Sequence, residues 1–395
     1  MNIRTIDTEG DIHPAQEGCL FSFDGPYGAL RGIGAAQPIP RGRGDTLESR
    51  LAGLAGMIGG ALPFSDQDED CLWRADSVLT SQALPVASQM AAALLPKVRS
   101  MQPEPPVGDF ASAVAQALRI MGDSAGQDQA LTKVVLSRTL ALTTDRPIPA
   151  DLVMARLAQD RTVTTFATRL PDQPGQDGPR LLIGATPELL LRKSGAQIVS
   201  HPLAGSAPRS ADPVRDRAAA NGLLQSDKDR REHALVVEYI LDVLAPFCAD
   251  LGCPEGTTLT HTGSMWHLGT RIQGRLRDES LPSILLASRL HPTPAICGLP
   301  VRRAADLIHQ LEPVPRGFYA GATGWNDAQG DGAWFVTIRC AEICGTTARL
   351  HAGAGIVPGS DPMAEAAETG AKFGALLDAL GLPRAAGMTG IHSAS

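Results

Sequence analysis

The most informative stretch of the chain is RLHAGAGIVPGSDPMAEAAETGAKFGALLDAL, residues 349–380. It predicts a short apolar strand, a loop of small residues at 353–355, and then a helix. The first turns of that helix carry Glu365, Glu368 and Lys372, and residues three or four positions apart share one helix face. Glu368 and Lys372 would form a simple pair on a solvated helix. Alternatively, the cluster lies at the edge of a packed stripe and holds a divalent metal with an anionic ligand.

The composition is that of a globular protein of 395 residues, with 43% hydrophobic and 19% charged side chains. The formal net charge of −7 and the lack of a basic run argue against a nucleic-acid partner. The N-terminal segment has no apolar core of a signal peptide, and no long apolar run occurs, so we expect a cytoplasmic protein with no membrane partner. The seven cysteines form no C-x-x-C pair, which favours reduced thiols over zinc or disulfides.

Two charged candidates lie in largely apolar runs. Lys133 lies in LTKVVLSRTLAL, 131–142, which predicts a strand, and a lysine in such a strand is usually at the edge or rim of a sheet. Glu188 lies in LLIGATPELLL, 181–191, which predicts a hairpin with a tight turn at GATPE. Apolar surroundings raise the pKa of a carboxyl group, as a general acid requires, but the exposed face of a hairpin is an equal alternative.

Two further segments contribute charged candidates. Residues 227–244 form the best amphipathic helix in the chain, with Glu232 at the margin of its apolar stripe, where it needs a metal, a cation or a donor. Residues 317–343 predict a hairpin around NDAQGDG, followed by a strand that carries Arg339 among apolar neighbours. An arginine in such a place usually binds a carboxylate of the protein or of a ligand, and Tyr319 is placed to assist it.

Taken together, these segments resemble the chorismate-utilising enzymes, the group of anthranilate, aminodeoxychorismate, salicylate and isochorismate synthases. The resemblance runs from about residue 133 to about residue 380. It rests on five blocks in family order: GATPELLL with PLAGSAPR, KDRREHALVVE, HPTPAICGLP, FYAGATGW with GDGAWFVTIRCA, and HAGAGIVPGSDPMAEAAETGAK. The sequence is most similar to isochorismate synthases that feed dihydroxybenzoate siderophore pathways.

The resemblance implies an α+β fold of the anthranilate synthase component I type. We therefore expect one large chorismate-binding domain over residues 1–395, in which helices surround a two-sheet β-sandwich core. Within it, residues 1–110 would complete the sheets, 111–383 would form the family core, and 384–395 would be a disordered tail.

The resemblance also implies roles for individual residues. Lys133 matches the general base that activates water, and Glu188 matches the general acid. Glu232 and Glu368 match the Mg²⁺ ligands, with Glu365 in the outer shell. The remaining matches are expected to bind the substrate: Gly205, Ala295, Tyr319, Arg339, Gly353, Ala354, Gly355 and Lys372.

The implied reaction is the Mg²⁺-dependent isomerisation of chorismate to isochorismate, in which water adds at ring carbon 2 and the carbon 4 hydroxyl leaves. Aminodeoxychorismate synthases that use a covalent lysine carry it in a PIKGT-like loop, whereas this chain has PLAGS at 202–206. Because water is the favoured nucleophile, no glutamine amidotransferase subunit is expected. The alternatives are a salicylate synthase, which goes on to eliminate pyruvate, and a non-catalytic chorismate-binding subunit.

Overall fold

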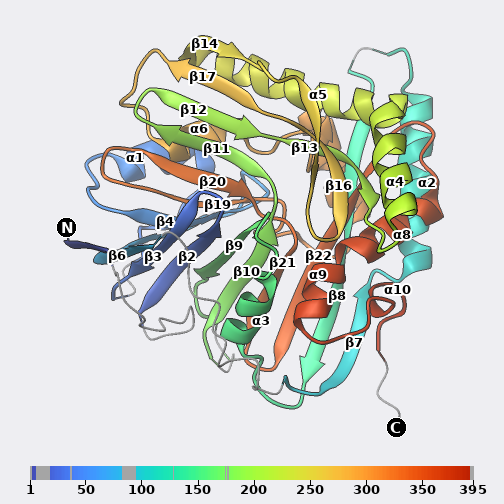
Figure 1. Cartoon of the computed structure of the whole chain (residues 1–395), viewed down its shortest axis with the longest axis horizontal. Helices are drawn as coiled ribbons and strands as arrows, with labels where there is room; N and C mark the ends of the chain where they lie inside the picture. The colour runs from blue at the N-terminus through green and yellow to red at the C-terminus, as the bar shows by residue number, and fades with distance from the viewer. Residues whose placement is uncertain are drawn as a thin grey trace.

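The structure is a computed structural model that describes residues 2–5, 18–35, 38–81, 95–127, 129–173, 175 and 178–391 (Figure 1). Two large β-sheets form its centre, and a small third sheet lies beside them. Among the described residues, no helix is both long and apolar enough to cross a membrane.

The larger sheet contains eleven strands, of which the first ten follow one another in space and the last pairs with β8. In that order they are β1 (Asn2–Thr5), β6 (Ser77–Ser81), β3 (Gly28–Ile33), β2 (Cys19–Gly25), β9 (Thr164–Arg169), β10 (Arg180–Thr186), β21 (Cys340–Cys344), β22 (Thr347–Ile356), β8 (Lys133–Thr144), β18 (Gly298–Leu299) and β7 (Val98–Glu104).

The second sheet has eight strands and the third has three. The eight are, in spatial order, β14 (Cys248–Gly252), β17 (Ile272–Leu276), β12 (Gln197–His201), β11 (Leu189–Ser194), β20 (Gly332–Val336), β19 (Ala322–Asn326), β4 (Ile58–Leu62) and β5 (Cys71–Arg74). The three are β13 (Leu203–Pro208), β16 (Met265–Thr270) and β15 (Thr257–His261). Strands from the first part of the chain thus contribute to both large sheets.

Helices pack around these sheets (Figure 1). They are α1 (Leu47–Leu51), α2 (Val107–Asp123), α3 (Ala150–Leu157), α4 (Pro213–Gln225), α5 (Asp227–Leu244), α6 (Ser283–Leu290), α7 (Val301–Leu311), α8 (Pro362–Lys372), α9 (Gly374–Ala379) and α10 (Ala386–Thr389). The predicted helix at 227–244 is confirmed to its ends as α5, whose first turn is capped by the Ser226 hydroxyl. The predicted hairpin around NDAQGDG is also confirmed, as β19 and β20.

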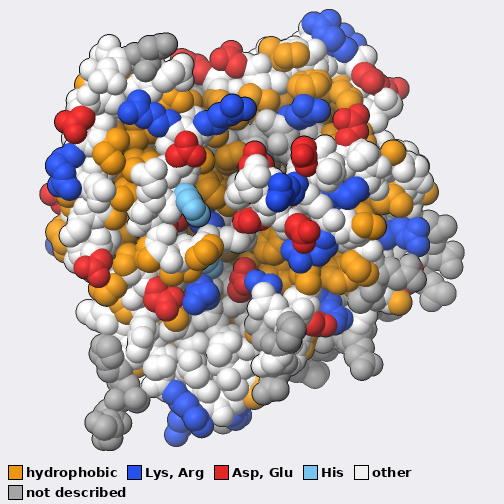
Figure 2. All heavy atoms as spheres, turned by 180° about the vertical axis from the view of Figure 1, so that it is seen from behind, with side chains coloured by type: hydrophobic (Ala, Val, Ile, Leu, Met, Phe, Trp, Pro, Cys, Tyr) orange, Lys and Arg blue, Asp and Glu red, His pale blue; other side chains and the backbone are white. Residues whose placement is uncertain are grey.

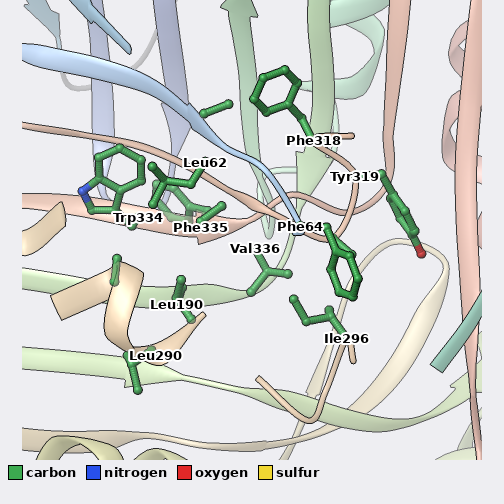
Figure 3. Close-up of a cluster of buried hydrophobic side chains, with 14 of the residues drawn as sticks. Leu62, Phe64, Leu190, Leu290, Ile296, Phe318, Tyr319, Trp334, Phe335 and Val336 are labelled. Atoms are coloured by element: carbon green, nitrogen blue, oxygen red, sulfur yellow. The ribbon is translucent and has the colours of Figure 1, made fainter. Parts of the chain in front are cut away.

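The main hydrophobic core takes side chains from both large sheets. Phe23 of the larger sheet stacks on Phe335 of the eight-stranded sheet, with 6.1 Å between their ring centroids. Figure 3 shows Phe335 with Leu62, Leu190 and Trp334 in this core. Burying a side chain of this size contributes about 1.5–3 kcal/mol, so the core holds the two sheets together. A second cluster packs α3 and α9 against the other face of the larger sheet.

Two predictions of local structure are wrong. GATPE is no hairpin turn, because β10 belongs to the larger sheet and β11 to the eight-stranded one. Residues 353–355 are no loop but part of a strand, β22, and pair with residues 135–137 of β8. In each case a distant strand supplies the backbone hydrogen bonds, and a local pattern does not show that partner.

The end of the chain also differs from the predicted disordered tail at 384–395. Helix α10 lies within that range, and Gly387 O accepts a hydrogen bond of 2.7 Å from Arg138 Nη2. The backbone of Ile391 exchanges two hydrogen bonds with that of Met101. Residues 392–395 lie outside the described part of the chain.

Candidate active site

Two of the connections by which the chain crosses between the two large sheets lie side by side. One runs from β10 to β11 and carries Glu188, and the other runs from β20 to β21 and carries Arg339. Val336 N donates to Glu188 O (3.1 Å), Thr186 Oγ1 donates to Val336 O (2.7 Å), and Ala185 N donates to Arg339 O (3.1 Å). These bonds hold Glu188 and Arg339 on neighbouring backbones.

Arg339 was predicted on a strand, but it precedes β21 and has a φ of +51°. This is a conformation that non-glycine residues seldom adopt, and the surrounding hydrogen bonds maintain it. Its side chain is buried, as predicted for an arginine that binds a carboxylate. Burial lowers the pKa of its guanidinium, while Glu368, Tyr319 and Glu188 oppose that shift.

Both connections open onto a pocket that also involves α5, α8, β8, β13, β16 and β22. The pocket brings together most of the residues predicted from the sequence: Glu188, Gly205, Glu232, Ala295, Tyr319, Arg339, Gly353, Gly355, Glu368 and Lys372. Ala354 does not line it, because its side chain faces the hydrophobic core. Lys133 and Glu365 lie just outside the lining, each paired with a residue that belongs to it.

Lys133 lies at the start of β8, and its side chain is fully buried, so the expected place at the rim of a sheet is wrong. Its Nζ lies 2.8 Å from Glu232 Oε1, on the face of α5 that turns toward β8. Among the described residues, no acceptor meets that Nζ in good hydrogen-bond geometry. A buried amine in this state has donor capacity for a water molecule or a ligand.

Lys372 and Glu368 form the second lysine–glutamate pair, with Nζ and Oε1 2.6 Å apart. Lys372 also donates to Gly353 O at 2.9 Å, and Ser206 Oγ donates to Glu368 Oε1 at 3.1 Å. Burial opposes ionisation of Glu368, but Lys372 and Ser206 outweigh it and lower the pKa of that carboxyl group. Glu368 is therefore an anion at neutral pH.

Glu365 forms a third pair with Lys228, whose Nζ lies 3.3 Å from Oε1. Burial raises the pKa of Glu365, and the Lys228 ammonium counters the rise. Since Lys228 lines the pocket and is 42% exposed, this pair lies at the pocket mouth.

Glu188 is the carboxyl group with the strongest shift in the pocket. Burial raises its pKa to about 7, against the opposing effects of a backbone hydrogen bond at Leu203 and of Lys133, Lys372 and Arg339. The group is therefore ready to exist in both protonation states at neutral pH, as a proton donor requires. Of the two alternatives for Glu188, the exposed hairpin face is wrong, because its side chain is buried.

Replacing Glu188 with glutamine should change the pH dependence of stability. Because the folded protein binds this proton more tightly than the unfolded chain does, the wild-type protein loses stability as pH rises from about 4.5 to about 7. Urea unfolding should therefore show the glutamine variant gaining up to about 3 kcal/mol over wild type between pH 5 and pH 8. Glu342→Gln, outside the pocket, controls for loss of a carboxylate. An equal difference at both pH values would contradict the prediction.

Some pocket residues were missed in the sequence. His267 on β16 lies opposite Ser206 of β13, and both line the pocket. Its Nε2 is buried without a partner among the described residues. Burial, then Arg339 and Lys372, lower the pKa of His267 to about 3, so its ring is neutral. His267 lies far from the other candidates along the chain, so nothing in the sequence groups it with them. Only the pairing of β13 with β16 places it in the pocket.

Tyr319 and His351 also line the pocket. Their rings stack with centroids 4.9 Å apart and planes 15° apart. Gly353 makes room for the tyrosine, since a Cβ there would lie 2.7 Å from Tyr319 Oη. The glycines of β22 therefore leave space for side chains of neighbouring segments, and they do not form the predicted loop.

The donor set of the pocket fits a hard divalent cation. Glu232 and Glu368 both line it, and Mg²⁺ is commonly held by one or two carboxylates, with substrate oxygens and water completing its shell. Among the described residues, no group of three or more His, Cys, Asp or Glu side chains is arranged to hold a metal by itself. A Mg²⁺ ion would therefore take water or substrate oxygens for the rest of its shell.

If Glu232 is a ligand of Mg²⁺, Gly355→Ala should weaken Mg²⁺ binding, because the new Cβ would lie 2.7 Å from Glu232 Oε1 and displace that carboxylate. We expect a loss of affinity of roughly tenfold by isothermal titration calorimetry with MgCl₂. Gly108→Ala on α2 is the matched control, because a Cβ there meets no atom within 4 Å. An unchanged affinity in Gly355→Ala would refute the assignment of Glu232 as a ligand.

Figure 2 shows how charged side chains are distributed on one face of the molecule. On the face in Figure 2, lysine and arginine side chains are interspersed with aspartate and glutamate, and the described residues form no continuous basic patch there.

Comparison with known proteins gives the family. The profile of the family described as "Chorismate binding enzyme" matches residues 66–381. The chain belongs to this family. It is 39% identical over 386 residues to the isochorismate synthase DhbC of Bacillus subtilis (strain 168), covering 94% of this chain and 96% of that protein.

Solved structures agree with this assignment. A Bacillus anthracis structure, assigned as a 2,3-dihydroxybenzoate-specific isochorismate synthase, DhbC, superposes with a TM-score of 0.83. It is 37% identical and matches 93% of this chain and 97% of that one. Anthranilate synthase component I of Streptococcus pneumoniae, 18% identical over 95% and 94% of the two chains, shares the fold with a TM-score of 0.67. The predicted fold type is therefore confirmed.

Proposed function

We infer that this member of the family is an isochorismate synthase, which isomerises chorismate to isochorismate with Mg²⁺ as cofactor. The observation that carries the inference is one pocket that combines a carboxyl group with a pKa of about 7 and two further carboxylates, one of which is paired with a buried amine just outside the lining. The relative that is 39% identical over nearly the whole chain is an isochorismate synthase.

Lys133 and Glu188 are the proposed proton-transfer groups. In its neutral form, Lys133 takes a proton from the water that adds at ring carbon 2. Glu188 donates its proton to the hydroxyl that leaves carbon 4, so that no net proton is consumed. The elements of water are gained and lost once each, as an isomerisation requires.

The remaining pocket residues bind and orient the substrate. Arg339, with Tyr319 beside it, binds one of the two substrate carboxylates through its guanidinium. Gly205, Ala295, Gly353 and Gly355 shape the wall, Lys372 adds positive charge, and Ala354 contributes only backbone. Glu232 and Glu368 would hold Mg²⁺, which when bound supplies positive charge to the ring carboxylate. Glu365, paired with Lys228 at the mouth, belongs to the outer shell.

Water as the nucleophile has consequences for partners. The proposed reaction uses no ammonia, and therefore no glutamine amidotransferase subunit. The seven cysteines, all within the described residues, form no disulfide, which is usual in the reducing cytoplasm, where we place the enzyme. The product would supply dihydroxybenzoate formation for a siderophore, in keeping with the name of the Bacillus anthracis structure.

The test is an assay of purified protein with chorismate and MgCl₂, with products separated by chromatography. We expect Mg²⁺-dependent formation of isochorismate and no pyruvate. Salicylate with stoichiometric pyruvate would identify a salicylate synthase, and chorismate recovered unchanged would overturn the catalytic proposal.

A further inference from the structure

One edge of β8 lacks a strand partner over a short segment. Along its other edge, β22 pairs continuously with residues 134–143. On the open edge, β18 pairs with Lys133 and Val134, and the pairing with β7 begins only at Thr139. Cys297 O accepts the N–H of Val135 at 2.8 Å, but the next backbone groups lie beyond the reach of either strand.

Two side chains take the place of the missing strand. Helix α7 ends at Leu311, and the carboxylate of Glu312, the next residue, accepts the backbone N–H of Ser137 at 2.7 Å. Arg316 Nη2 donates to Val135 O, also at 2.7 Å. A carboxylate and a guanidinium therefore supply the acceptor and the donor that a neighbouring strand would provide.

The two side chains also bind each other. Arg316 Nε lies 2.9 Å from Glu312 Oε2, and Arg316 Nη2 lies 2.6 Å from Oε1. The side chains are 3% and 6% exposed, so the pair is fully buried. Replacing a buried ion pair with apolar side chains is often neutral or stabilising, so stability alone does not explain a pair in this place.

Arg316 also contacts two other segments that contribute to the pocket wall. Its Nη1 donates to Ile296 O at 2.8 Å, and its backbone carbonyl accepts the N–H of Tyr319 at 2.9 Å. Its guanidinium lies 4.3 Å from the ring centroid of Phe64. Figure 3 shows Phe64 beside Ile296, with Tyr319 on the neighbouring connection.

Three of these contacts lead directly to the pocket. Val135, Ile296 and Tyr319 all line it, and they come from β8, from the connection after α6 and from the connection after α7. Lys133 is two residues from Val135 on the same strand. A shift of Arg316 would therefore move three walls of the pocket and the buried amine together.

We propose that Glu312 and Arg316 are positioning residues of the active site, which fix the Lys133 strand against the Ile296 and Tyr319 walls. Neither touches the pocket itself. The proposal rests on the proposed function for the reaction it serves, while the fixing of β8 can be tested without any turnover.

Arg316→Lys is the decisive variant. It keeps the positive charge, but one ammonium cannot reach Glu312, Val135 O and Ile296 O in the geometry of a planar guanidinium. We expect kcat/KM for chorismate to fall by roughly 10²-fold, mainly through KM, because the displaced walls bind substrate. Hydrogen exchange measured by mass spectrometry should also become faster in peptides covering 133–138 and 293–297.

Two further variants separate positioning from general stability. Glu312→Gln retains an acceptor for Ser137 N–H, so its kcat/KM should fall between wild type and Arg316→Lys. Arg50→Lys is the matched control, because Arg50 also joins a buried carboxylate, Asp70, to a backbone carbonyl, that of Pro40, but does so outside the pocket. It should leave KM within about twofold of wild type even if the melting temperature falls.

The outcomes divide clearly. A large KM effect in Arg316→Lys, with faster exchange in β8 and an unaffected Arg50→Lys, supports the proposal. Unchanged KM in Arg316→Lys, or equal KM effects in both arginine variants, overturns it. If wild-type protein does not convert chorismate, the proposed function fails, and the exchange data decide by themselves: faster exchange confined to the two peptides supports the fixing role, and unchanged exchange overturns it.

Discussion

Lys133→Met should lower kcat for chorismate conversion by about 10²- to 10⁴-fold, the usual contribution of a general base. Methionine approximates the length of lysine and suits a side chain that is fully buried, so the strand should keep its place. The loss would follow from the missing amine, whose Nζ has no well-placed acceptor among the described residues and so has capacity for a water molecule. Steady-state kinetics with product chromatography would measure it.

Lys193→Met is the matched control for this experiment. Lys193 is also a buried lysine paired with a carboxylate, with its Nζ 2.7 Å from Asp331 Oδ1 and 1% exposure, but it does not line the pocket. Its variant should lose stability while the folded protein keeps its kcat. If Lys133→Met keeps kcat within tenfold of wild type, Lys133 is not the base.

Glu188→Gln should also lower kcat by about 10²- to 10⁴-fold, because an amide has the shape of the carboxyl group but no acidic proton for the leaving hydroxyl. KM should change little, since the variant preserves the size of the side chain and the backbone bond between Val336 N and Glu188 O. The same variant is expected to be more stable than wild type above pH 7. Loss of activity with gain of stability would separate a catalytic defect from a folding defect.

The double variant Lys133→Met with Glu188→Gln sharpens this prediction. When two groups act in the same chemical step, the effects of their substitutions on kcat are not additive. The double variant should therefore be little slower than the slower single variant. Glu342→Gln, which removes a carboxylate paired with Arg180, should retain wild-type kcat. Turnover of Glu188→Gln at the wild-type rate would remove Glu188 from the mechanism.

Local patterns predicted those parts of the fold that local interactions determine. Helix α5 was predicted to its ends because its apolar stripe and polar face both lie within one continuous segment. Residues 181–191 show the limit. Two apolar strands around a short turn resemble a hairpin, and only the partners β21 and β20, distant in the chain, place them in different sheets.

Local patterns also predicted only part of the candidate site. The burial of Lys133 depends on Glu232 of α5, so the pattern of β8 alone suggested a rim residue. Its proposed role, like that of Glu188, came from family resemblance. His267 had no local signal at all, because a histidine within a short strand is usually structural, and its unpaired Nε2 is visible only once β16 lies beside β13.

The two adjacent connections that carry Glu188 and Arg339 have a consequence for how the protein folds to its active form. Each crossing has one end in either sheet, so their side chains acquire a common geometry only when the sheets have docked in register. A refolding chain that has completed one sheet alone would be structured yet inert. Recovery of turnover after dilution from denaturant should therefore lag behind recovery of secondary structure, and coincide with burial of Trp334 in the core.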